Sequence, residues 1–126
     1  MPTRLAVPHK PDPTTVAAKA LLRAAELLDM SARDVSGVIG LSEASVSRLK
    51  HEGGTTRLAG KAYELALLFI RLYRSLDALM GGDDAKSRAW LHAHNDHLRG
   101  VPAERIRTVE GLVDVVQYLD AMRGRL

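Results

Sequence analysis

The chain contains no cysteine, and this absence excludes disulfide bonds, thiolate zinc sites and cysteine nucleophiles together. Aromatic residues make up only 4% of the 126 residues, so the core has to be built from leucine, valine, isoleucine and alanine, which favours helices. The longest apolar run, Leu65 to Ile70, is far shorter than the roughly 20 residues of a membrane-spanning helix. We therefore expect a cytoplasmic protein without contact to a membrane.

The chain also lacks a large excess of either charge, because 18 basic residues and 15 acidic residues give a net charge of +3. This small excess permits nucleic-acid binding but does not indicate it, so that function must rest on where the charges lie. The first residues lack the apolar segment of a secretory signal and carry prolines. We expect residues 1–12 to form a flexible intracellular arm.

Apolar residues recur at helical spacing along the chain, and no stretch shows the period of two that a half-buried strand requires. The sequence therefore predicts an all-α protein. The expected helices are Thr14 to Leu28, Ala32 to Ile39, a third capped by Ser42 and ended by Gly53-Gly54, Lys61 to Met80, a short one through Trp90, a single turn opened by Pro102, and a last one from Val109 capped by Thr108.

The segment from Ala32 to His51 has the spacing of a helix-turn-helix, in which the second helix is held rigidly for entry into the major groove of DNA. Gly40 suits the turn, Ser36 the close approach of the helices, and aliphatic residues occupy the inward positions. The outward positions are small or polar. A helical hairpin with a merely solvated face is the alternative.

Candidate DNA contacts follow from these outward positions. Arg48 suits guanine, Ser47 suits either kind of base edge, and the methyl group of Ala44 suits thymine. Arg33, Ser42, Ser45 and Lys50 suit phosphates, which set the register of the protein on the duplex. The full predicted DNA-binding set is Arg33, Ser42, Glu43, Ala44, Ser45, Ser47, Arg48, Lys50 and His51.

This segment, Ala32-RDVSGVIGLSEASVSRLK-His51, resembles the helix-turn-helix of Xre, or Cro/cI-like, repressors. The resemblance implies binding to operator DNA. This resemblance and the breaks in the sequence together predict four regions: an arm over residues 1–12, a DNA-binding region over 13–60, a connecting helix over 61–80 and a second domain over 83–126. We expect the connecting helix also to mediate homodimerisation through its broad apolar surface.

The second half carries three histidines and an aspartate in one short polar segment, from His92 to His97. This segment can be interpreted as a metal site or as a polar surface loop. The loop is favoured because structural metal sites usually combine ligands from separate elements. Trp90 is interpreted as a core anchor in preference to a ligand platform. No arrangement of residues indicates a catalytic site.

As an ordered string, the second half resembles the toxin-binding domain shared by Xre, MbcA and ParS antitoxins. His94 and Arg99 stand where that family has a proline and one of two paired glycines. The matching positions are Trp90-Leu91, Asn95, Leu98, Gly100, Pro102, Glu104, Ile106, Thr108, Gly111, Val115, Leu119 and Gly124.

The resemblance implies a non-enzymatic antitoxin without cofactor or small-molecule substrate. Its partner would be a RES-domain toxin with an ADP-ribosyltransferase-like fold that consumes NAD, and the antitoxin would block the NAD pocket while repressing its own operon. We expect the guanidinium groups near the C-terminus and the Leu126 carboxylate to enter that pocket, with the loop up to Gly100 as a second contact. The predicted toxin-binding residues are Asn95, Leu98, Arg99, Gly100, Arg123, Gly124, Arg125 and Leu126.

Two other functions remain open at this point. A stand-alone Xre-type repressor without a toxin partner would need only the first half of the chain. A small hydrolase or a metal-dependent enzyme would need activated carboxylates or ligands from separate elements, and only the histidine segment offers any.

Overall fold

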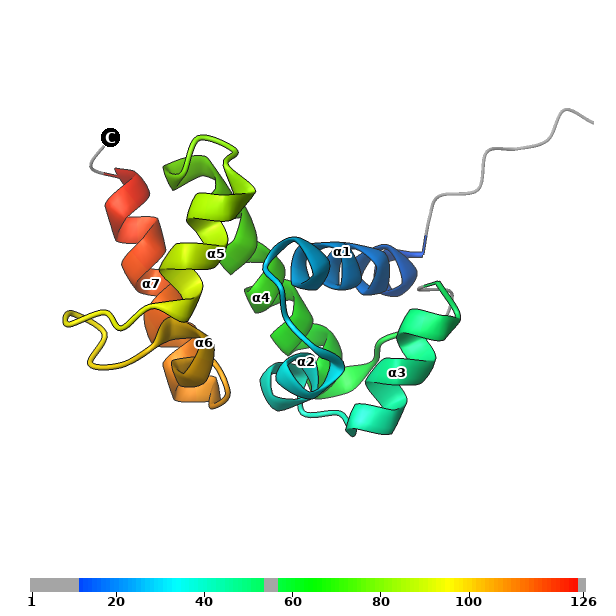
Figure 1. Cartoon of the computed structure of the whole chain (residues 1–126). Coiled ribbons are helices and arrows are strands. Elements are labelled where there is room, and N and C mark those ends of the chain that lie inside the picture. Colours follow the sequence, from blue (N-terminus) through cyan, green and yellow to red (C-terminus); the bar gives the residue numbers. More distant parts are fainter. Residues whose placement is uncertain (1–11, 54–56, 125–126) are drawn as a thin grey trace, which may run out of the picture.

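The structure is a computed structural model that describes residues 12–53 and 57–124. The described residues form seven helices and no strand, which confirms the all-α prediction (Figure 1). No helix among them has the length and apolar character needed to cross a membrane. The helices are α1 Pro13–Leu27, α2 Ala32–Ile39, α3 Glu43–His51, α4 Gly60–Leu79, α5 Asp84–His92, α6 Pro102–Arg105 and α7 Val109–Gly124.

The helix ends agree closely with the capping signals in the sequence. The Asp12 carboxylate accepts hydrogen bonds from the hydroxyl and the backbone N–H of Thr14, at 2.6 and 2.9 Å, and these bonds lower the pKa of Asp12. Ser31 and Asp34 form a capping box at the start of α2, and Gly40 ends that helix in the left-handed conformation, with φ at 74°. Gly54, the second glycine expected at the end of α3, lies outside the described residues.

Helix α4 occupies the centre of the molecule, where α1 and α2 pack on part of its surface and α7 and α5 on the rest (Figure 1). Ala66, Phe69, Leu72 and Leu76 are all at most 1% exposed. The apolar surface of α4 is therefore covered largely within the chain. Its breadth no longer argues for a second copy, and homodimerisation stays a prediction.

One hydrophobic cluster runs through both halves of the described chain, from Leu21 and Val35 to Leu112 and Leu119. The turn at Gly81-Gly82, where both residues have positive φ, joins α4 to α5 without separating two cores. The expected domain boundaries remain predictions.

Polar contacts reinforce this packing between α4 and α7. The Ser75 hydroxyl, 1% exposed, donates to Asp120 Oδ1 at 3.0 Å, and Arg71 binds the same carboxylate. A guanidinium N–H of Arg123 donates to Ser75 Oγ at 3.3 Å. The end of α7 is thus tied to the middle of α4.

Helix α5 reaches back to α1 in a similar way. Arg88 donates to the Leu27 carbonyl at 3.3 Å, and His92 Nε2 lies 2.9 Å from the Leu28 carbonyl. These carbonyls at the end of α1 have no partner within their own helix, so α5 supplies what that helix end lacks.

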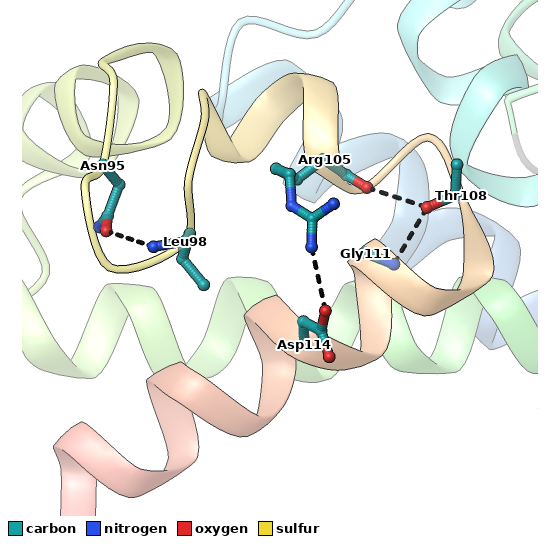
Figure 2. A network of polar contacts seen from close by, with 6 residues as sticks. All are labelled: Asn95, Leu98, Arg105, Thr108, Gly111 and Asp114. Atoms are coloured by element: carbon teal, nitrogen blue, oxygen red, sulfur yellow. Dashed lines mark hydrogen bonds and ion pairs between the residues drawn. The ribbon is translucent and has the colours of Figure 1, made fainter.

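The short helix α6 lies so close to α7 that only glycine fits at position 111. A Cβ placed on Gly111 would lie 1.8 Å from the Arg105 carbonyl oxygen and 2.7 Å from the Arg105 carbonyl carbon. The Gly111 N–H donates to Thr108 Oγ1 at 3.0 Å, which confirms Thr108 as the cap of α7 (Figure 2).

We predict that Gly111→Ala lowers the free energy of unfolding by about 3 kcal/mol, because the new methyl group meets backbone atoms that move only if α6 moves. Urea denaturation followed by circular dichroism at 222 nm measures this change. Gly124→Ala is the control, since no described atom outside its own helix turn lies within 4 Å of a Cβ there. Equal stability of the two variants would contradict the close approach of α6 to α7.

Candidate functional site

The helix-turn-helix predicted between Ala32 and His51 is present in α2 and α3. Val35, Ile39, Val46 and Leu49 are each at most 3% exposed, so the inward positions hold the two helices together. The small side chain of Ser36 donates its hydroxyl to the Arg33 carbonyl at 2.8 Å. The second helix is therefore held rigidly by its core face, as a helix that enters the major groove must be.

The predicted DNA-binding residues gather on the outer side of this unit, where all are exposed except the half-buried Ser45. Ser42 Oγ accepts from the Ser45 N–H at 3.1 Å and donates to Ser45 Oγ at 2.9 Å. Arg48 then donates to the same Ser45 Oγ at 3.1 Å. The sequence predicted the cap but not this chain of hydrogen bonds, which holds the Arg48 guanidinium over the first turns of α3.

The two remaining basic residues of α3 lie in its last turn, away from that chain. Lys50 lines an open groove of about 580 Å³ together with Lys19 and Arg23 of α1. His51 is exposed. Cations at this end of the helix also complement its dipole, as Glu43 does at the start.

In the second half, the segment from Asn95 to Gly100 forms a tight loop. Backbone hydrogen bonds of 2.9 and 3.2 Å join its two ends, and Asn95 Oδ1 accepts from the Leu98 N–H at 3.0 Å (Figure 2). The Leu98 side chain is 7% exposed and belongs to the core, whereas Arg99 is exposed. Of the predicted toxin contacts in this loop, Arg99 alone presents an exposed side chain.

Arg99 also adopts the left-handed conformation, with φ at 58°. The family that this half resembles is expected to have a glycine at this position, and an arginine there is strained because its Cβ crowds the backbone. The loop closes nevertheless, since its paired ends and Asn95 fix its course.

The three histidines near this loop have three separate partners. His92 bonds to the Leu28 carbonyl, His94 lies 3.0 Å from Asp96, and the His97 ring centroid lies 4.8 Å from that of Tyr118. Within the described ranges, no group of three potential ligands could hold a metal ion. The geometry supports the interpretation of this segment as a polar surface loop.

A groove of about 660 Å³ runs between this loop and α7. Arg105 of α6 and Asp114 of α7 form an ion pair of 3.0 Å along it (Figure 2). Tyr118 lies in its lining and stacks on the half-buried Trp90, with ring centroids 6.3 Å apart. The sequence analysis missed Arg105 and Asp114, because their ion pair joins two helices at a separation that no local spacing rule covers.

The last predicted toxin contacts lie at the end of α7. Arg123 and Gly124 are exposed, although Arg123 also donates to Ser75 Oγ. Arg125 and Leu126 lie outside the described residues.

Comparison with protein families agrees with both halves of this description. Residues 7–71 match the family described as the antitoxin Xre-like helix-turn-helix domain. Residues 75–125 match the family described as the antitoxin Xre/MbcA/ParS C-terminal toxin-binding domain. The two matches meet within α4. No curated protein matches the chain.

We predict that Arg99→Gly raises the free energy of unfolding by about 0.5–1 kcal/mol, because relief of left-handed strain exceeds the added chain entropy of glycine. Thermal and urea unfolding measure the change. Asp29→Gly is the matched control, since Asp29 also has positive φ, at 55°, but aspartate tolerates that conformation better. A loss of stability in Arg99→Gly would show that the arginine side chain contributes more than the strain costs.

Proposed function

Because the chain belongs to the Xre/MbcA/ParS antitoxins, we propose that it neutralises a RES-domain, NAD-consuming toxin and represses its own operon. Members of this family are not enzymes, and their two domains imply a toxin partner and DNA binding. The identity of the toxin, the way it is blocked and the control of the operon are the parts that we propose.

The observation that carries this proposal is the separation of the two functional ends. Helix α3 lies at one end of the molecule, and the end of α7 lies at the other (Figure 1). A protein bound at the C-terminal end therefore leaves the outer side of α3 open to DNA. One chain has room for both partners at once.

The C-terminal segment is suited to a site that binds NAD. Arg123 is exposed, and Arg125 follows it in the sequence. Guanidinium groups form paired, charge-assisted hydrogen bonds with carboxylates, and carboxylates in the wall of the toxin pocket are the partners that we propose for them. We propose that Arg123, Gly124, Arg125 and Leu126 occupy the pocket of the toxin and exclude the dinucleotide.

The loop from Asn95 to Gly100 is proposed as a second contact. Arg99 stands exposed on it, and the groove beside it is lined by both charged and aromatic side chains. Arginine and tyrosine are enriched among the residues that dominate protein interfaces. Trp90 behind Tyr118 gives that ring a fixed position.

Control of the operon would depend on α3. Glu43 and Glu52 offset Arg48 and Lys50 in and beside this helix, so one copy has little net charge for DNA. We therefore propose that specific binding requires a homodimer, in which two copies of α3 enter successive turns of the major groove. Such binding weakens steeply with salt.

Neutralisation is tested by co-expressing the chain with the toxin-like reading frame beside it while growth and intracellular NAD are followed. Deletion of residues 123–126 is expected to abolish protection, and deletion of 125–126 to weaken it. Ser75→Ala is the control, because it removes the partner of Arg123 but leaves the C-terminal sequence intact. It is expected to protect.

Full protection by the chain that lacks residues 123–126 would overturn the proposed role of this segment. A neighbouring reading frame that neither halts growth nor lowers NAD would favour the alternative, a stand-alone Xre-type repressor.

Repression is tested with a reporter under the promoter of the operon and with a duplex of the same sequence in solution. We expect Arg48→Ala to lower affinity for that duplex by about tenfold, the value of one paired contact to a base. Arg74→Ala is the control, since Arg74 is equally exposed but lies on α4. Equal repression by both variants would contradict a reading role for α3.

A further inference from the structure

Arg107, which no sequence argument singled out, lies between α6 and α7 and rests on α2. A Cβ placed on Gly37 would lie 2.9 Å from Arg107 Nε, 3.5 Å from its Cγ and 3.6 Å from its Cζ. Glycine at position 37 thus leaves the space in which the arginine side chain lies against the backbone of the first helix of the helix-turn-helix. A residue from the toxin-binding domain thereby reaches the DNA-binding domain.

The side of α2 that Arg107 covers is its outer side. Val35, Val38 and Ile39 are buried on the opposite side of the helix. Gly37 follows Arg33 by four residues, which places both on one face, one turn apart. Arg107 therefore adds a second guanidinium to the face on which Arg33 is expected to contact a phosphate.

Within residues 12–53 and 57–124, neither arginine has an acidic partner. Arg33 and Arg107 are both exposed, and neither takes part in any ion pair found among the described residues. In contrast, Arg23, Arg57, Arg71 and Arg105 each have a carboxylate partner. Two unpaired guanidinium groups on one face repel each other and attract an anion.

The position of this face in the molecule indicates which anion it attracts. Helix α2 packs directly on α3, and α6, α2 and the start of α3 follow one another along the lower edge of the view in Figure 1. In a helix-turn-helix, the first helix crosses the DNA backbone while the second lies in the groove. A phosphate group of the bound duplex fits both the charge and the place.

We propose that Arg107 contacts the DNA backbone beside Arg33, so that the toxin-binding domain itself contributes to the DNA interface. This inference rests on the DNA binding proposed above. Because phosphate contacts carry no sequence information, Arg107 would add affinity on any duplex without altering the preference among sequences.

The test measures affinity of the full chain for two duplexes of equal length, one from the promoter of its operon and one scrambled, over a series of salt concentrations. We expect Arg107→Ala to weaken both by the same factor, about fivefold near 0.15 M salt, and to lower the slope of log K against log salt by about one per bound chain. Arg74→Ala, also exposed, is the matched control and is expected to change neither value.

Gly37→Ala tests whether the position of the Arg107 side chain against α2 matters, without removing its charge. The added methyl group overlaps only the flexible arginine side chain, so the fold is expected to persist while the guanidinium is displaced. Affinity should fall in the same direction as in Arg107→Ala. In the double variant the effect of Gly37→Ala should vanish, because the two residues act through one contact.

The outcomes separate the inference from the function on which it rests. If the unaltered chain binds neither duplex, the proposed repression fails. If it binds and Arg107→Ala leaves affinity and salt slope unchanged, the inference is wrong. Loss of toxin binding in Arg107→Ala with unchanged DNA affinity would likewise overturn it and assign the residue to the toxin interface.

Discussion

The architecture depends on covering the apolar surface of α4. Phe69, Leu72 and Leu76 are almost completely buried, and removal of each such side chain from water contributes about 1.5–3 kcal/mol. A helix with an apolar stripe this wide needs neighbours on more than one side. Since α1 and α2 cover one part and α7 another, the two domains of this antitoxin share a core, and neither can shed α4 without exposing apolar surface to water.

Polar groups at the edges of that core determine the relative orientation of the packed helices. Ser75 and Asp120 join α4 to α7, and Arg88 and His92 complete the end of α1 from α5. A buried polar group without a partner is costly, so these bonds favour one arrangement of the helices over others that would bury the same apolar area. The core supplies the stability, and its polar rim selects the geometry that fixes both binding ends.

The helices and their caps could be predicted from sequence because capping and periodicity are local. Ser31 with Asp34, Gly40 and Thr108 each act on residues within one turn. What could not be predicted depends on contacts between distant segments. Gly111 is required by the Arg105 carbonyl of another helix, and Gly37 accommodates Arg107 from seventy residues further along the chain. The partners of His92 and His97 emerge only when α5 meets α1 and the following loop meets α7. The same limit applies to the width of α4, which predicts a second neighbour without telling whether it comes from this chain or from a copy.

The distribution of charge separates two kinds of contact with DNA, the reading of bases and the general attraction to the backbone. Glu43 in α3 and Glu52 beside it offset the positive charge of that helix, so its polar and apolar contacts suit the reading of bases better than general attraction to DNA. General attraction requires guanidinium or ammonium groups without acidic partners. We propose that Arg33 of α2 and Arg107, which lies against Gly37, supply it, since neither has an ion pair in the part of the chain that the structure describes. Since Arg107 belongs to the toxin-binding domain, removal of this domain would cost affinity for DNA even if the helix-turn-helix stayed folded. Shared burial of α4, together with the DNA surface that we propose, gives a reason for keeping both domains in one fold.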